Sequence, residues 1–541
     1  VASDQLYAGD TVLHDGIYEF SSLKNGGVAS GLGKSQEFAQ NWIMDGGGYK
    51  YTGGNTSTDR SARLYNDTEF DVANKSATVT MNGSMEGNGN LIIGGEGTVS
   101  VNTTNFFKYS GDLVMNSGTL KLNTKEVSEA GLGTASKLVM QGGLFVTKGK
   151  NEGNVTYNFP IQVPEGANGT VDFDLWNSNK CNVSGQGTLT WNVHYVREYI
   201  EGNWDNFTGK LIVNGTGNAG SSQFAVRNGV GVKNATLQLK GNAAVHGAKT
   251  NSTYYLGGLS GDASTFLAGF DVKTAGKGTW VVGGANTDET FRGVINDYDQ
   301  KNSHAGTTSI QKDGSGDWRL TGTNVYSGTT TVAKGRLIVN GKHTGTGAVT
   351  VRSGATLAGF GQLYGATVIN SGATLQAGDT LINGRGITFY STLKLNGSAI
   401  LNVLVNNQKS NAITVRAATT IGADAVLQFN GGELTEKPMN GVEYKVFTIS
   451  GGSITGQFKE IQPATPGEGL KWDVTNLYTR GTVKVVVDDE GAGVHTQSTA
   501  NPARKEYFTL DGTKVSEPVK GMYVLRTTAA DGKTTTKKVK K

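Results

Sequence analysis

A short repeated motif constrains the fold of this chain more than any other feature of its sequence. Ser-Gly-Ala-Thr-Leu occurs at residues 353–357 and again at 371–375, and weaker versions occur at 117–120 and 334–337. Segments in which apolar and polar residues alternate, such as residues 329–332, recur along the chain. A period of two places successive side chains on opposite faces of an extended strand. The repeat therefore predicts many short β-strands separated by turns.

A second repeated element is an aromatic residue two positions before a glycine, as at Tyr109, Phe207, Phe291 and Tyr326. One strand unit of this size has a single apolar face, so the units must stack and align their apolar side chains in a shared core. Glycine supplies the positive φ angles that tight corners need. We therefore predict an all-β chain: a right-handed parallel β-helix, or β-solenoid, over residues 1–487, followed by a small C-terminal β unit.

Composition agrees with a chain that turns often and excludes several classes of protein. There are 80 glycines and only 7 prolines. The glycines lack the three-residue period of collagen, and apolar residues recur too often for a disordered chain. The net charge of +4 resides at the C-terminus, because residues 505–541 hold 9 basic and 4 acidic residues while the rest of the chain holds 40 and 41. No nucleic-acid partner is therefore predicted.

The segment after residue 317 resembles a known repeat family. Residues 318–332 read Trp-Arg-Leu-Thr-Gly-Thr-Asn-Val-Tyr-Ser-Gly-Thr-Thr-Thr-Val, and the two Ser-Gly-Ala-Thr-Leu motifs follow. This pattern is similar to the autotransporter-associated β-strand repeat of passenger-type β-helices. The resemblance is specific over residues 318–487, looser over 91–317, and rests on composition alone before residue 91. It implies a secreted protein that is extracellular or displayed at the cell surface.

The end of the chain has a different character. Residues 488–504 are rich in Gly, Ser, Thr and Asn and are predicted to form a linker. Residues 505–541 contain three short strand-like segments and end on several lysines. They resemble the C-terminal sorting domain of type IX secretion in Bacteroidota-type bacteria. The resemblance implies that the secretion machinery recognises residues 505–541 as a partner.

One charged cluster suggests an enzymatic alternative. Polysaccharide lyases often use parallel β-helices, with carboxylates that bind calcium and a basic residue that abstracts a sugar proton. Tryptophan rings beside such a cluster could stack on sugars, which makes them candidate glycan contacts. The charged residues are Arg197, Glu198, Glu201 and Asp205, and the neighbouring tryptophans are Trp191 and Trp204.

Other candidate sites are weaker. Asp297, Asp299 and Asn302 offer oxygen ligands for calcium in one loop, although the spacing departs from an EF-hand. Asp172 and Asp174 share one strand face, as a glycosidase pair or a solvated strand would. The segment Gly-Lys-Ser at 33–35 lacks the first glycine of a phosphate loop. We predict no cofactor, with calcium as the one exception to test.

The sequence thus predicts a non-catalytic surface solenoid that acts as a stalk, an adhesin or a glycan-contacting module. A polysaccharide or a cell-surface glycan is the predicted ligand, because a solenoid presents long rows of repeated side chains. No run of apolar residues is long enough for a membrane-spanning helix. The alternatives are a polysaccharide lyase or other polysaccharide-degrading enzyme, or an accessory stalk of a larger enzyme with a domain before Val1.

Overall fold

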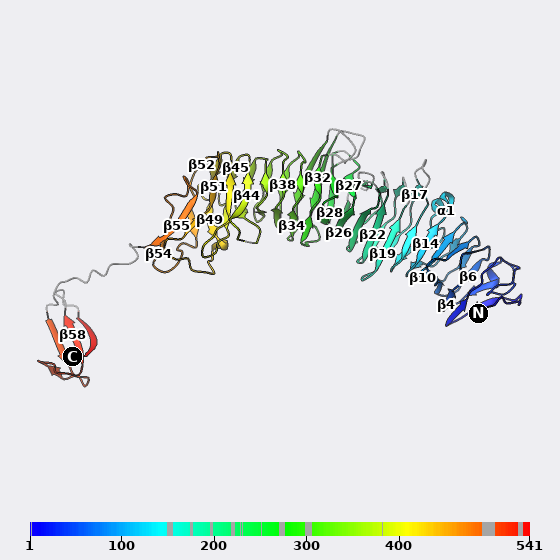
Figure 1. The fold of residues 1–541 in the computed structure, drawn as a ribbon, viewed down its shortest axis with the longest axis horizontal. Helices are drawn as coiled ribbons and strands as arrows, with labels where there is room; N and C mark the ends of the chain where they lie inside the picture. Colours follow the sequence, from blue (N-terminus) through cyan, green and yellow to red (C-terminus); the bar gives the residue numbers. More distant parts are fainter. Residues whose placement is uncertain are drawn as a thin grey trace.

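The computed structural model describes residues 1, 3–148, 155–173, 177–194, 198–217, 222–227, 229, 231–249, 251–269, 276–297, 306–380, 382–488, 504–528 and 534–540. From β1 (Thr11–Leu13) to β53 (Glu460–Gln462), short strands wind into coils that stack along an elongated, gently curved rod (Figure 1). The single α-helix described is α1 (Lys125–Ala130). The predicted fold class is confirmed, because the described chain is nearly all β and its body is a parallel β-helix.

The coils present three faces. The first face consists of three successive sheets: β1 to β12 (Phe107–Tyr109), β17 (Val155–Tyr157) to β32 (Val294–Asn296), and β35 to β51. The second face begins with the sheet from β2 (Ile17–Phe20) to β21 (Val183–Gly185). The third face begins at β5 (Thr56–Thr58), which pairs with β8 (Thr78–Met81). The second and third faces share one hydrogen-bonded network, because β26 (Gly231–Gly241) and β28 (Ser252–Gly261) each turn the corner between them.

Two sets of strands position the residues discussed below. The third face of the later coils contains β34 (Asp317–Leu320), β37 (Arg336–Val339), β40 (Thr356–Gly359), β43 (Thr374–Ala377), β46 (Ile400–Val403) and β49 (Val426–Phe429). The first face of the same coils contains β35 (Thr323–Asn324), β38 (Lys342–His343), β41 (Gln362–Leu363), β44 (Arg385–Phe389), β47 (Ala412–Val415) and β51 (Phe447–Ile449). All of these strands pair in parallel.

The two repeated pentapeptides occupy equivalent corners of adjacent coils. Leu357 lies opposite Leu375 in paired strands, and Gly354 and Gly372 have φ angles of +77° and +72°. Full burial of one leucine contributes about 1.5–3 kcal/mol, and it is reached only when neighbouring coils stack. The same inward row, at most 1% exposed, also contains Trp318, Leu337, Leu401 and Leu427.

The N-terminal end of the rod is held closed around one arginine. Arg60 is 1% exposed, and its guanidinium donates hydrogen bonds to the carbonyls of Lys24, Val28 and Gly33 and to the hydroxyl of Ser35. A guanidinium carries five N–H donors in a rigid plane, so one side chain fixes several irregular turns. Part of the phosphate-loop-like segment therefore binds Arg60.

The other end of the rod is covered by antiparallel strands. Strand β55 (Thr482–Val487) pairs with β50 (Glu443–Lys445) on one side and β54 (Leu470–Asp473) on the other. The ring of Trp472 packs on Phe429 of the last coils at a centroid distance of 4.7 Å. A change from parallel to antiparallel pairing ends the stack and covers the edge on which further strands could add.

The first of the two breaks in the first face falls where α1 lies between β12 and β17 in the chain. The hydroxyl of Thr124 caps this helix by accepting a hydrogen bond from the amide of Val127, which is buried. A short helix can therefore replace a strand in one coil without breaking the stack. The sequence analysis did not predict this helix.

The C-terminal strands form a sheet of their own. Its order is β57 (Lys514–Val515), β56 (Arg504–Phe508), β58 (Met522–Thr528) and β59 (Thr534–Lys540), and every pairing is antiparallel. Most of the predicted linker lies outside the described residues. The predicted limits of the body at 1–487, the linker at 488–504 and the sorting-type domain at 505–541 stay predictions.

Candidate functional site

The carboxylates of the charged cluster predicted near residue 200 do not converge. Glu198 in β23 (Glu198–Ile200) is fully buried, and one of its carboxylate oxygens accepts a hydrogen bond of 2.7 Å from the indole nitrogen of Trp191. Glu201 and Asp205 lie at the surface, where they form ion pairs with basic residues of the next coil. These ion pairs are Glu201 with Arg227 at 3.2 Å and Asp205 with Lys233 at 3.0 Å.

This arrangement does not match the geometry expected for a lyase. A lyase needs its carboxylates and its base to face one sugar ring, whereas Glu198 faces the core and Glu201 and Asp205 are neutralised at the surface. Arg197, the predicted base, lies outside the described residues.

The tryptophans predicted as glycan contacts are core residues. Trp191 in β22 (Thr188–Val193) is 0% exposed and Trp204 is 1% exposed. Their ring centroids lie 6.1 Å apart, and Trp191 also packs on Phe173 at 4.8 Å. A tryptophan that stacks on a sugar needs at least one ring face reachable from solvent, and neither of these rings has one. The expectation that these two rings contact a glycan is therefore corrected: they stabilise the interior of the solenoid.

Three polar side chains from successive coils meet outside the core. Asp172 in β19 (Asn168–Asp172) lies 2.8 Å from Nε2 of His194, and Nδ1 of His194 lies 2.5 Å from the hydroxyl of Thr216. A carboxylate, an imidazole and a hydroxyl in this order match the orienting acid, the base and the nucleophile of a catalytic triad. It also forms a hydrogen-bonded ladder that ties three coils together. Asp174, the second predicted carboxylate, lies outside the described residues.

The predicted calcium loop is described only in part. Both carboxylate oxygens of Asp297 already accept backbone hydrogen bonds: the Ser327 amide donates to each at 3.0 Å, and the Thr308 amide donates to Oδ1 at 2.8 Å. Asp299 and Asn302 lie outside the described residues. Among the residues that are described, no group of three or more His, Cys, Asp or Glu side chains could hold a metal ion. Calcium binding at this loop stays a prediction.

A row of half-buried tyrosines and an exposed arginine follows the first face of the later coils. Tyr364 and Tyr390 come directly after strands β41 and β44, and their rings stack at 4.1 Å with an interplanar angle of 6°. The guanidinium of Arg416, directly after β47, lies 4.9 Å from the Tyr390 ring centroid. Interaction with the Tyr390 side chain raises the pKa of Tyr364.

A second outward row runs beside the first. Register places Lys342, Gln362, Thr388 and Thr414 opposite one another in four successive coils. Arg385, at the start of β44, lies 5.9 Å from the ring of Phe360. Because residues two apart in a strand share a face, the two rows form one surface. Arg385 is exposed and borders this surface at the start of β44. We call the surface that contains Lys342, Tyr364, Arg385, Tyr390 and Arg416 the Tyr–Arg strip.

Sequence reasoning did not find the Tyr–Arg strip, although one signal for it was present. Tyr364, Tyr390 and Arg416 each follow a buried residue that ends a first-face strand, namely Leu363, Phe389 and Val415. Aligning the coils on those buried residues would have placed the three side chains in one row.

The third face of the same coils carries an ion network instead of free charges. Arg319 donates two hydrogen bonds to the carboxylate of Asp379, at 2.9 and 3.1 Å, and Asn340 donates a third at 3.1 Å. Burial raises the pKa of Asp379, but the hydrogen bonds from Arg319 and Asn340 outweigh it and hold that pKa below its usual value. Arg336 pairs in the same way with Asp317. These groups neutralise one another and link coils along the rod.

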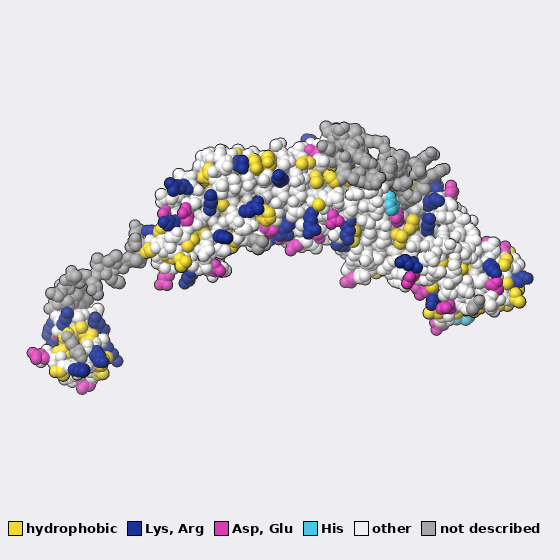
Figure 2. All heavy atoms as spheres, in the orientation of Figure 1, with side chains coloured by type: hydrophobic (Ala, Val, Ile, Leu, Met, Phe, Trp, Pro, Cys, Tyr) yellow, Lys and Arg dark blue, Asp and Glu magenta, His cyan; other side chains and the backbone are white. Residues whose placement is uncertain are grey.

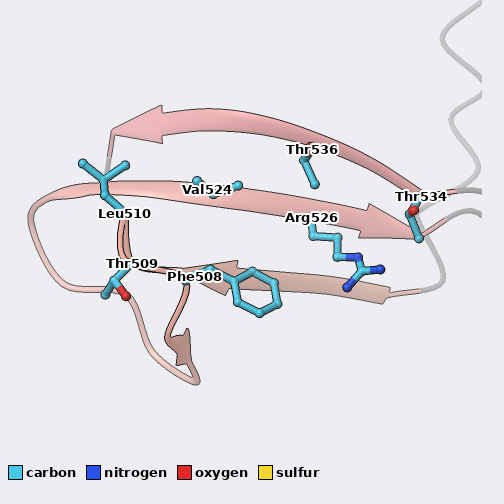
Figure 3. A pocket seen from close by; sticks show the side chains of 8 residues that line it. Phe508, Thr509, Leu510, Val524, Arg526, Thr534 and Thr536 are labelled. Carbon is cyan, nitrogen blue, oxygen red and sulfur yellow. The ribbon is translucent and has the colours of Figure 1, made fainter.

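The C-terminal sheet has an open cavity of about 390 Å³ on one face. Figure 3 shows the rings and methyl groups of Phe508, Leu510 and Val524 beside it, with Arg526 and Thr536 at its side. Leu510 is 61% exposed. The small unit therefore presents a mixed surface, in which three apolar side chains lie beside threonine hydroxyls and one cation.

Comparisons with known proteins agree with the repeat identified in the body. The family model described as the passenger-associated-transport-repeat matches residues 310–339, which extend from β33 (Thr307–Lys312) to β37. The chain is 29% identical over 360 residues to the adhesin BmaC autotransporter of Brucella suis biovar 1 (strain 1330). That alignment covers 61% of this chain and 9% of the adhesin, so the chain spans a small part of its relative's length. The similarity to passenger-type β-helices is confirmed, and the sorting-domain resemblance stays a prediction.

Proposed function

We propose that this chain is the solenoid of a secreted, cell-surface adhesin and that its outer faces contact glycans without cleaving them. The observation that carries the proposal is the Tyr–Arg strip, because it places hydroxyls, an amide and cations on successive coils, and these cations form no ion pair with any described residue. Rows of this kind favour weak contacts repeated along a polymer, which together give strong attachment. The similarity to a protein named as an adhesin supports the same function.

The test is attachment of the full chain to glycans. Beads that carry the folded protein are applied to surfaces coated with neutral and acidic polysaccharides, and beads with heat-unfolded protein serve as the control. We expect retention of the folded protein on at least one polysaccharide, with no shortening of that polysaccharide. Retention no greater than that of the unfolded control on every surface would contradict the proposal.

We also propose that export uses residues 505–541 as a sorting signal read by a type IX secretion machine. Support comes from the separate antiparallel sheet of β56 to β59 and from the exposed side chain of Leu510 beside its open cavity. Among the described residues, no helix is long and apolar enough to cross a membrane. The proposal includes removal of the tail at the surface, so the intact mass of the protein recovered from its native cells will lack residues 505–541. A recovered mass that includes Lys541 contradicts this proposal and leaves adhesion untouched.

A further inference from the structure

We propose that the Tyr–Arg strip binds an acidic polysaccharide, a chain of sugar rings that carries carboxylates at intervals. This inference rests on the proposed glycan-contacting function. It adds the charge of the ligand and the residues that bind it.

Positive charge is concentrated in the coils that bear the strip. Residues 321–420 contain eight Lys and Arg but a single acidic residue, Asp379, which Arg319 already binds. Within the part of the chain that the structure describes, Lys342, Arg385 and Arg416 form no ion pair. Lys and Arg side chains are scattered between β38 and β52 (Ile454–Thr455) in Figure 2, with few acidic ones among them. An anionic ligand would be attracted to this part of the rod.

The stacking within the strip argues against nucleic-acid bases as its ligand. Single-stranded nucleic acids bind by laying bases on open aromatic faces. Tyr390 is covered by Tyr364 on one side and by the guanidinium of Arg416 on the other. Neither face of the Tyr390 ring is therefore open to a base. Hydroxyls beside cations suit a ligand that itself carries hydroxyls and carboxylates.

The spacing of the cations along the strip also argues against a nucleic-acid ligand. Successive coils are separated by roughly 4.8 Å, the spacing of neighbouring strands in a sheet. A strip with about one cation per coil is too dilute for duplex DNA, which carries a charge every ~1.7 Å. The uncharged side chains of the same row, Gln362, Thr388 and Thr414, lie in the coils that carry the cations or next to them and can bind sugar hydroxyls. A polymer with one carboxylate among several hydroxyls on each ring matches this alternation.

The experiment measures binding of the full chain to polygalacturonate, neutral dextran and oligodeoxythymidylate by calorimetry at several salt concentrations. R385Q/R416Q removes two cations of the strip, and Y364F/Y390F removes two hydroxyls while keeping the ring stack. The matched control is K75Q/K108Q, which removes the same charge from exposed positions in early coils. Melting curves establish that each variant is folded.

We expect wild type to bind polygalacturonate more tightly than the other two probes, with an affinity that falls as salt rises. R385Q/R416Q is expected to weaken this binding at least about tenfold and to flatten its salt dependence, because two charge contacts are lost. Y364F/Y390F should weaken it without changing the salt dependence, and K75Q/K108Q should stay within about twofold of wild type.

Equal effects of R385Q/R416Q and K75Q/K108Q would overturn the inference, as would tighter binding of oligodeoxythymidylate than of polygalacturonate. A third outcome separates the two proposals: wild type and both strip variants bind dextran equally well, and wild type does not prefer polygalacturonate. In that case the inference of an acidic ligand fails, but the proposed contact with glycans is supported. If wild type binds no polysaccharide, both fail.

Discussion

Replacing Arg60 tests how the N-terminal end of the solenoid is held closed. Arg60→Met keeps an unbranched stem but removes every donor, so the carbonyls of Lys24, Val28 and Gly33 and the hydroxyl of Ser35 lose their partner. One buried polar group without a partner costs about 1–3 kcal/mol, and two of these hydrogen bonds, to Gly33 and Ser35, are buried. We therefore expect R60M to destabilise the first coils by about 2–6 kcal/mol.

Arg63→Met is the matched control. The side chain of Arg63 is 38% exposed and pairs with Glu86 at 3.5 Å, and an exposed pair of this kind contributes about 1 kcal/mol or less. Hydrogen exchange is measured at residues 22–38 and, as a distant reference, at residues 393–429. Because coils couple only to their neighbours, R60M should speed exchange at 22–38 and leave 393–429 unchanged. Equal exchange at 22–38 in R60M and R63M would refute the role assigned to Arg60.

Four further outcomes are expected. Leu375→Ala empties part of the inward row and should lower stability by about 2–5 kcal/mol in urea unfolding, whereas the exposed Lys394→Ala should change it by about 0.5 kcal/mol or less. Burial lowers the pKa of Lys312 to about 8, so the unfolded chain binds more protons between pH 8 and 10.5. Stability should therefore rise with pH in that window, and Lys312→Met should remove this rise. The pKa of Asp379 is lowered in the folded chain, so this carboxylate stabilises the fold above the ordinary aspartate pKa, and that stability is lost as the pH falls through the folded pKa. Asp379→Asn should therefore make the free energy of unfolding depend less on pH below about pH 4. Chelation with EDTA should leave the melting temperature unchanged, because the oxygens of Asp297 already accept backbone hydrogen bonds; a fall on chelation that calcium reverses would show a calcium site.

The fold could be predicted from the sequence because the residues that stack in adjacent coils belong to short local repeats. Leu357 and Leu375 belong to the same pentapeptide, so their alignment in adjacent coils follows from the 18-residue spacing. The next coil is longer, since Leu375 pairs with Leu401, 26 residues on. Such a change in coil length hides which side chains become neighbours. Tyr364 and Tyr390 are 26 residues apart for the same reason, and their stacking emerges only in the folded chain.

The alternation of inward and outward side chains along a strand explains why the burial of Trp191 could have been predicted and that of Trp204 could not. Leu189, Trp191 and Val193 alternate with polar residues, so the period of two already places Trp191 on the apolar, inward face. Trp204 lies outside any strand, so this alternation does not indicate where its side chain points. Glu198 could not have been placed from sequence, because a glutamate is expected at the surface unless a buried partner such as the Trp191 indole is known.

One titration tests the central claim, that this solenoid attaches to glycans without cleaving them. Polygalacturonate is added to the full chain in a calorimeter, and the recovered sample is examined for the ultraviolet absorbance of unsaturated uronate, with and without calcium. The account predicts saturable heat of binding and no rise in absorbance. A rise in absorbance would show a lyase and contradict the account, and the absence of any binding heat would contradict the assignment of the Tyr–Arg strip.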